Sequence, residues 1–326
     1  MKRLVAALVV FAVLALLSTL ASAERTPRIG YLTLESIRDT PSRERKAFLD
    51  DLVEFGHVPG KSVEVIYRSA ESEPEFLSAM CEELLSQKVD VVTTLGELPT
   101  RACLEVTRTV PIVFVGVGDP IGIQAAESLA RPGGNATGVS YTLVDLAAKR
   151  IELLKLAVPD ADRIAFLWDA RSRVARLEAA AAQSAARKGG AETIPMPVES
   201  QTGLNERFKQ IATDRPDALY VGFTPGVIAR NRTAIAEFAL EQRLAVVSAW
   251  AYMTEAGGLM SYSPDNVAVV RRGAYYVHRI LDGTPPSELP IEQIGKIELV
   301  INQGTARRLG LRLPSELMLR ANRVIE

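Results

Sequence analysis

Hydroxyl, carboxylate and aromatic side chains recur in this chain directly after short apolar runs that have the length of buried β-strands. In open parallel sheets, ligands bind beyond the carboxyl ends of the strands, so residues at these positions are candidates whatever their type. Aromatic rings would supply apolar contact area, while hydroxyl, carboxylate and free amide groups would orient a small polar ligand. The candidate ligand-binding residues are Tyr31, Thr33, Thr94, Gly96, Glu97 and Asp119 in the first half of the chain, and Trp168, Asp169, Phe223, Thr224 and Trp250 in the second.

Residues suited to catalysis or metal binding are scarce. The two histidines, His57 and His278, are interpreted as surface or packing residues, one in a turn and one in a helix. No nucleophile elbow, Walker loop or zinc-binding helix motif occurs. The glycines of residues 116–119 superficially resemble a dinucleotide loop, but a third glycine at the required spacing is missing and the strand is the wrong one. The sequence therefore predicts no catalytic residue, no cofactor and no metal.

The amino terminus has the pattern of a cleavable secretory signal. Lys2 and Arg3 precede an apolar run over 4–17, and residues 21–23, Ala-Ser-Ala, offer a small-residue cleavage site. The apolar run is shorter than the roughly 20 residues that a membrane-spanning helix needs. Because no cysteine stands at the cleavage point to carry a lipid, a signal peptide over 1–23 and a mature protein free in the periplasm are expected.

The charge balance argues against polyanionic partners. Without Lys2 and Arg3, 36 of the 38 basic residues remain against 39 acidic ones, a net charge of −3 with no run of like charges. Nucleic acid and anionic membranes are therefore not expected as partners, and a monomer is expected. The only cysteines, Cys81 and Cys103, fall on neighbouring predicted helices. A disulfide is possible in an oxidising compartment, but two buried free thiols are the preferred interpretation.

Short runs rich in Val and Ile alternate with helical patterns along the chain, which is typical of β-α units around parallel sheets. About 300 mature residues exceed one ordinary core, so two lobes are expected. A helix is predicted at 123–130 and another at 143–157. Strands are predicted at 29–32, 63–67, 89–93, 112–117 and 137–141 in one block, and at 164–168, 192–196, 218–223, 245–249 and 259–263 in the next.

Several stretches carry a resemblance to a known family. The most specific is 128–140, SLARPGGNATGVS, and the others are distributed over 55–61, 89–93, 111–120, 149–154, 256–262, 289–292 and 298–326. Together they resemble the ABC transporter substrate-binding proteins, a family that includes tryptophan and phenylalanine binders. The resemblance covers essentially the whole mature chain.

The resemblance implies an α/β protein with the type I periplasmic-binding fold, in which two Rossmann-like lobes with parallel sheets close on a ligand. Lobe I is expected over 24–141 plus 264–290, and lobe II over 142–263 plus 291–326. The hinge crossovers are expected to include Ser140, Tyr141, Ser263 and Pro264. The implied function is transport: a small, amino-acid-like solute is captured between the lobes and delivered to the membrane permease of an ABC importer.

The sequence departs from the family pattern at one place, and two alternative functions remain open. After the third strand stands Leu95-Gly-Glu-Leu-Pro, where the family more often has small residues and hydroxyls. Glu97 either faces the ligand and favours an amine-bearing solute, or is a solvated residue in the first turn of a helix. The alternatives are a periplasmic sensing module for a membrane receptor, and a periplasmic enzyme that uses Asp119 or Glu97 as acid or base.

Overall fold

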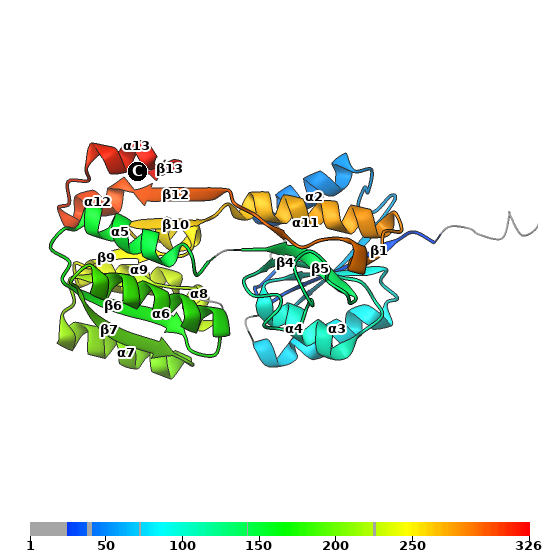
Figure 1. Cartoon of the computed structure of the whole chain (residues 1–326), viewed down its shortest axis with the longest axis horizontal. Coiled ribbons are helices and arrows are strands. Elements are labelled where there is room, and N and C mark those ends of the chain that lie inside the picture. Colours follow the sequence, from blue (N-terminus) through cyan, green and yellow to red (C-terminus); the bar gives the residue numbers. More distant parts are fainter. Residues whose placement is uncertain (1–24, 38–40, 72, 142, 224–225) are drawn as a thin grey trace, which may run out of the picture.

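The computed structural model describes residues 25–37, 41–71, 73–141, 143–223 and 226–326. The signal peptide predicted over 1–23 and the candidate residue Thr224 lie outside them. Two α/β lobes lie side by side, each with a central sheet between layers of helices (Figure 1). The expected fold class, two mostly parallel sheets flanked by helices, is confirmed.

The first lobe contains a 6-stranded parallel sheet in the order β11-β5-β4-β3-β1-β2. Its strands are β1 (Arg28–Thr33), β2 (Glu64–Ser69), β3 (Val91–Leu95), β4 (Ile112–Val117), β5 (Ala136–Ser140) and β11 (Glu292–Gln293). Its helices are α2 (Arg43–Glu54), α3 (Leu77–Ser86), α4 (Glu97–Val106) and α11 (Asn266–Leu281), with short 3-10 turns at Pro74–Phe76 and Pro286–Glu288.

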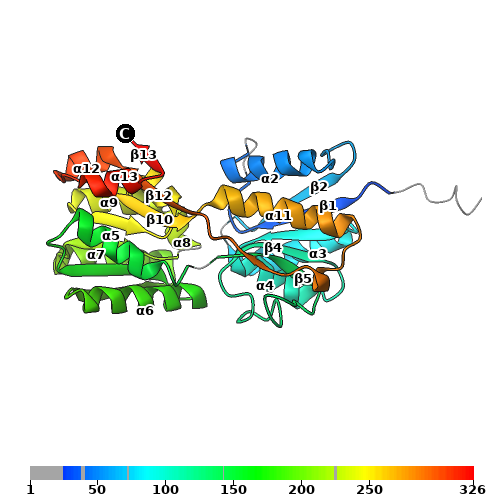
Figure 2. The ribbon, with the colours of Figure 1, turned by 45° about the horizontal axis from the view of Figure 1, so that its top comes forward.

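Alternation along the strands divides the core of this lobe into two layers. On β1, Ile29 and Tyr31 pack on the side of α2 and α11, whereas Leu32 packs on the side of α3 and α4. The two helical layers lie on opposite faces of the sheet in both views (Figures 1 and 2). Both faces of the sheet are therefore buried, which explains why its strands are nearly continuous apolar runs.

The second lobe contains a 7-stranded sheet in the order β13-β12-β10-β9-β8-β6-β7. Its strands are β6 (Arg163–Asp169), β7 (Glu192–Val198), β8 (Ala218–Val221), β9 (Ala245–Ser248), β10 (Met260–Pro264), β12 (Ile297–Asn302) and β13 (Arg323–Ile325). Its helices are α5 (Ala147–Ala157), α6 (Arg173–Lys188), α7 (Gln201–Asp214), α8 (Val227–Arg230), α9 (Arg232–Glu241), α10 (Ala251–Glu255), α12 (Gln303–Leu309) and α13 (Ser315–Arg320). Among the strands of the described residues, only β10 and β12 pair antiparallel. None of the helices in the described ranges is long and apolar enough to cross a membrane.

The chain passes between the lobes three times: between β5 and α5, between β10 and α11, and between β11 and β12 (Figure 1). The boundary expected at 290/291 is therefore wrong by a few residues. Glu292 pairs with Val139 of β5, so the chain leaves the first lobe only after Gln293. This two-residue strand covers the edge of β5 and is too short to carry an alternation pattern.

The helix predicted at 123–130 is absent, and turns occupy the segment. The Oδ1 of Asp119 accepts a hydrogen bond of 2.8 Å from the backbone N–H of Gly122. Gln124 then adopts a left-handed conformation with φ of 58°, which an α-helix does not accommodate.

The two cysteines form a disulfide between α3 and α4, with Cα atoms 5.6 Å apart. The preferred sequence interpretation, two free thiols, is therefore wrong. Cys81 and Cys103 are both fully buried in the core layer that also holds Leu84 and Phe114. The helical register that brings them together depends on how α3 and α4 pack, which their sequence spacing does not specify.

Removing this disulfide is expected to lower the free energy of unfolding by about 3 kcal/mol, because the bond closes a loop between residues 22 apart and restricts the unfolded chain. Urea unfolding with and without dithiothreitol measures the effect, and the double variant Cys81→Ala/Cys103→Ala serves as control because reductant should not change its midpoint. Equal midpoints for the oxidised and reduced natural chain would contradict the prediction.

Candidate ligand-binding site

Aromatic side chains gather where the carboxyl ends of the second sheet meet the first passage between the lobes. The ring of Trp250, just after β9, lies 5.4 Å from that of Tyr141 and 5.7 Å from that of Phe223, between centroids. Tyr252 stacks on Trp250 at 6.1 Å, and Trp168 at the end of β6 packs against the buried apolar group that contains Phe223 and Trp250. We refer to these five residues as the aromatic cluster.

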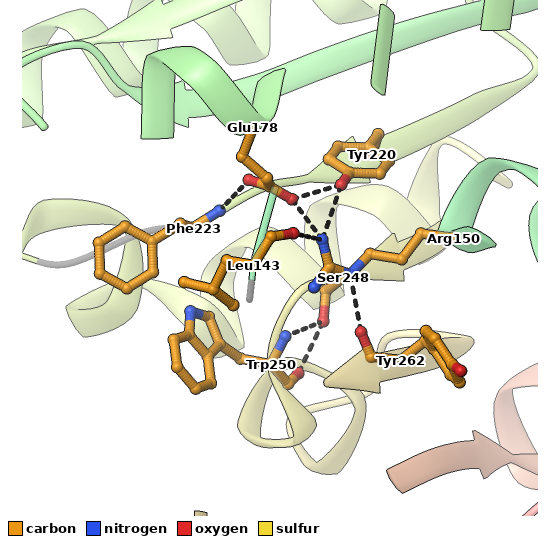
Figure 3. A network of polar contacts seen from close by, with 8 residues as sticks. All are labelled: Leu143, Arg150, Glu178, Tyr220, Phe223, Ser248, Trp250 and Tyr262. Atoms are coloured by element: carbon orange, nitrogen blue, oxygen red, sulfur yellow. Dashed lines mark hydrogen bonds and ion pairs between the residues drawn. The ribbon is translucent and has the colours of Figure 1, made fainter. Parts of the chain in front are cut away.

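Side-chain hydrogen bonds hold the backbone of this cluster at two places. The hydroxyl of Ser248 donates a 2.6 Å hydrogen bond to the carbonyl of Trp250 and accepts one of 3.2 Å from its N–H, which sets the turn at the end of β9 (Figure 3). The N–H of Phe223 donates to Oε2 of Glu178 at 2.6 Å. Trp250 and Phe223 each follow a buried strand. These hydrogen bonds to their backbones come from side chains rather than from the sheet.

Behind the cluster lies a buried polar network centred on Arg150 of α5 (Figure 3). Arg150 and Glu178 are both 0 % exposed, and Nη1 of Arg150 lies 2.6 Å from Oε1 of Glu178. The same nitrogen donates to the hydroxyl of Tyr220 at 3.2 Å and to the carbonyl of Leu143 at 3.3 Å. Its Nε donates to the carbonyl of Tyr262 in β10 at 2.7 Å.

This network joins the hinge region to the aromatic cluster. Leu143 follows the first passage between the lobes and Tyr262 precedes the second, so one guanidinium holds the chain near both. The other end of the network, Glu178, holds Phe223. Burial and the neighbouring carboxylate keep the pKa of Tyr220 well above its usual value, so its phenol stays protonated and donates to Glu178.

The first lobe contributes charged groups from the loops after β3 and β4. Asp119 forms an ion pair with Arg173 of α6, which belongs to the second lobe. Next to it, a Cβ on Gly118 would lie 2.9 Å from the side chain of Val174, so only glycine allows the two lobes this close an approach. Glycine also suits position 116, where φ is +76° and a Cβ would overlap the hydroxyl of Tyr141.

Glu97 is buried at the first position of α4, so the interpretation as a solvated helix residue is wrong. Burial raises the pKa of its carboxyl group, and this is partly offset by the positive charges of Arg101, Arg173 and Arg176. Its Oε2 atom is inaccessible and has no hydrogen-bond partner within the described part of the chain. A buried carboxyl oxygen without a partner is costly, and such groups occur at ligand sites more often than elsewhere.

Asp169 at the end of β6 is paired within its own lobe. Its Oδ1 and Oδ2 accept hydrogen bonds from the Arg171 guanidinium at 3.1 and 2.9 Å, and the backbone N–H of Arg171 adds a third at 2.9 Å. The bond from Asp169 and the attraction of its charge raise the pKa of Arg171 further, so this arginine remains charged at any physiological pH. The pair presents a half-exposed cation beside the cluster.

Three candidates serve structural roles. Tyr31 is buried, 5 % exposed, with its ring 5.5 Å from Phe48 and 5.4 Å from Tyr67, so in this structure its ring packs inside the first lobe. Thr94 is fully buried, and its hydroxyl pairs with that of Thr100 at 2.8 Å, which anchors the first turn of α4. Thr33 ends β1 and accepts a hydrogen bond from the N–H of Glu35.

Gly96 directly precedes α4, and its φ of +86° turns the chain so that Glu97 starts the helix. The sequence candidates that come together between the lobes are therefore Glu97, Asp119, Trp168, Asp169, Phe223 and Trp250. The aromatic residue Tyr141 was predicted only as a hinge residue, and Arg171 and Arg173 were missed. Arg171 lies two residues after β6 and Arg173 begins α6, so extending the rule that located Trp168 and Asp169 by four residues would have found them.

Two lobes whose facing loops carry aromatic and charged groups at the carboxyl ends of their strands are typical of proteins that bind small molecules. A family model described as ABC transporter substrate binding protein matches residues 37–325, and the chain belongs to this family. It is a solute-binding protein of the ABC transporter class and not an enzyme. The resemblance drawn from residues 128–140 and the other stretches is confirmed.

Individual relatives agree with this assignment. A tyrosine-binding protein of Clostridioides difficile is 21 % identical over 270 residues, which is 82 % of this chain and 77 % of the relative. An ABC domain from Streptococcus pneumonia in complex with L-Trp has a TM-score of 0.84 at 23 % identity, over 92 % of this chain and 100 % of that one. A ligand-free, open substrate-binding protein from Clostridium difficile has a TM-score of 0.67 at 21 % identity, over 92 % and 99 %.

Proposed function

We propose that this protein is the extracytoplasmic solute-binding component of an ABC importer and captures a small amino acid with an apolar, aromatic side chain between its lobes. The observation that carries the proposal is the aromatic cluster beside charges of both signs. An α-amino acid presents a carboxylate, an ammonium group and a side chain. Recognition therefore needs a cation, an anion and an apolar surface in one place.

The charged groups supply the first two requirements. Arg173 and the half-exposed Arg171 suit the carboxylate of the ligand, and Asp119 suits its ammonium group. Asp119 and Arg173 now neutralise each other across the lobes, and a zwitterionic ligand placed between them offers each a new partner of opposite sign. The buried Oε2 of Glu97, which has no partner within the described part of the chain, would offer one further polar contact from the first lobe.

The lobes stand in a closed arrangement. Besides Asp119 and Arg173, Arg230 of the second lobe lies 3.2 Å from Glu73 of the first, and the TM-score is higher with the L-Trp complex than with the open relative of similar identity. Opening would rotate the lobes about the three passages. The expected hinge residues Ser140, Tyr141, Ser263 and Pro264 flank two of them, and residues 294–296 form the third.

We propose in addition that the protein is exported and that it delivers its solute to a membrane permease. The signal-like amino terminus, with Lys2, Arg3 and the Ala-Ser-Ala of 21–23, supports secretion into the periplasm, where a monomer would diffuse to its permease. The closed form would be recognised by that membrane permease because only closure fixes the relative position of the two lobes. The names of the tyrosine- and tryptophan-binding relatives support an aromatic solute.

Isothermal titration calorimetry of the purified chain with tryptophan, phenylalanine and tyrosine tests this proposal, after unfolding and refolding to remove any bound solute. Arginine, leucine, succinate and ribose are the comparison ligands. We expect one-to-one binding of an aromatic amino acid and a smaller radius of gyration on binding. At a hundredfold excess over the dissociation constant, the ligand should stabilise the protein by about 2.7 kcal/mol.

Binding of one of the comparison ligands alone would replace the aromatic assignment and leave solute capture intact. A ligand that binds without any change in the radius of gyration and without loss of affinity in Asp119→Asn would contradict capture between the lobes. Conversion of the ligand during the titration, followed by chromatography, would indicate an enzyme instead.

A further inference from the structure

The two histidines of the chain lie side by side, although 221 residues separate them. His57 Nε2 and His278 Nδ1 are 3.1 Å apart, and the same Nδ1 lies 3.4 Å from Oδ2 of Asp282. These three atoms lie within 4.8 Å of one another. The cluster belongs to the first lobe alone and is formed by the turn after α2 and the last turn of α11.

The spacing of these atoms suits a metal ion. A zinc ion binds imidazole nitrogen and carboxylate oxygen at about 2.0–2.2 Å, so two ligands at a tetrahedral angle are about 3.3 Å apart. Two of the three separations, 3.1 and 3.4 Å, are close to that value. The third closes by rotation of the Asp282 carboxylate, whose side chain is 54 % exposed and therefore free to turn.

The local structure holds both imidazoles in place. The N–H of His57 donates to the carbonyl of Leu52 at 2.8 Å, which fixes the turn, and the ring of Phe55 stacks on that of His278 at 4.8 Å with an interplanar angle of 3°. His278 and Asp282 are one helical turn apart and so share a face. The rings are thus oriented before a metal arrives, which lowers the entropic cost of binding it.

The electrostatics favour a cation here. The site is at the carboxyl terminus of α11, where the helix dipole is negative, and Asp282 adds a full negative charge. The nearest basic neighbour in sequence, Arg279, donates to the hydroxyl of Tyr275 at 2.8 Å.

We propose that His57, His278 and Asp282 bind one zinc ion, with water completing the tetrahedron, and that the ion clamps the turn after α2 to the end of α11. Borderline divalent cations such as Zn²⁺ prefer two imidazoles and a carboxylate over the oxygen-only sets of Mg²⁺ and Ca²⁺. The sequence interpretation of both histidines as surface or packing residues did not foresee this, because their proximity depends on the packing of α2 against α11.

Equilibrium dialysis of the chelator-treated full chain against Zn²⁺, with metal counted by mass spectrometry, tests the proposal. We expect one zinc ion per chain, a rise in the melting temperature, and visible absorption bands of tetrahedral cobalt when Co²⁺ replaces Zn²⁺. In His278→Gln and His57→Gln these three signals should be lost. Because both side chains are only partly buried, circular dichroism should show these variants folded.

Asp282→Asn removes the anionic ligand and should weaken zinc binding at least tenfold. Asp50→Asn is the matched control, because Asp50 is also exposed and also paired with a residue one helical turn away on the same lobe, and it should bind zinc like the natural chain. Less than one zinc per chain in the natural protein, or equal binding in His57→Gln, would overturn the proposal. These readouts do not involve the ligand site between the lobes, so they test the zinc site independently of the proposed function.

Discussion

Replacing Arg150 by alanine is expected to lower the free energy of unfolding by about 3–5 kcal/mol. The substitution leaves the carboxylate of Glu178 buried without its counter-charge, and removing one member of a buried pair costs this much because the remaining charge is not solvated. The carbonyls of Leu143 and Tyr262 lose their donor at the same time. The loss is a large part of the 5–15 kcal/mol that keeps a domain folded.

Urea unfolding followed by circular dichroism measures this effect. Lys149→Ala is the control from the same helix, since Lys149 pairs with Glu152 at the surface and its loss should cost less than about 1 kcal/mol. Arg150→Met combined with Glu178→Gln should be less destabilised than Arg150→Ala, because a neutral amide still accepts from Phe223 and leaves no buried charge. A change below 1 kcal/mol in Arg150→Ala would show that water reaches this pair.

Replacing Trp250 by alanine is expected to weaken binding of the aromatic amino acid by about 2–4 kcal/mol, or 30- to 1,000-fold. Trp250 is only 6 % exposed and contacts Tyr141, Phe223 and Tyr252, so it forms the centre of the aromatic cluster. Truncation removes the largest apolar surface available to an aromatic ring. Trp250→Phe should recover part of the affinity because a smaller ring keeps part of that surface.

Calorimetry on each variant measures the change, with Phe238→Ala as matched control. Phe238 belongs to the same lobe and stacks on Phe208 at 4.4 Å, but lies in the core layer of α7 and α9. Its loss should reduce stability and leave the affinity for the ligand unchanged. If Trp250→Ala bound the ligand as tightly as the natural chain, the ligand would have to lie outside the aromatic cluster.

Part of the site could be predicted because the ends of buried strands are visible in the sequence. The apolar run of each strand ends abruptly before Asp119, Trp250 and Phe223, and parallel strands bring their carboxyl ends to one edge. The same rule selected Tyr31, whose ring packs inside the first lobe in this structure. It lies two residues before the end of β1, and alternation directs its side chain toward α2 rather than beyond the sheet.

The features that could not be predicted depend on packing between distant segments. Arg150 and Glu178 are 28 residues apart on two helices. Nothing in the sequence distinguishes them from ordinary charged residues at the surface. The disulfide needs the register of α3 against α4, and the pairing of His57 with His278 needs the packing of α2 against α11. In each case the sequence shows which side chains could interact, but it does not show that they lie close together.

The order in which the chain threads its two lobes constrains biosynthesis. One face of the first sheet is covered by Val269, Ala274 and Val277 of α11, which emerge from the ribosome only after most of the second lobe. Until then, Val113 and Val115 of the half-built sheet remain open to water and to other unfinished chains. A chain exported as proposed, amino terminus first, would therefore need protection over most of its length, and neither lobe can be produced alone as one continuous fragment.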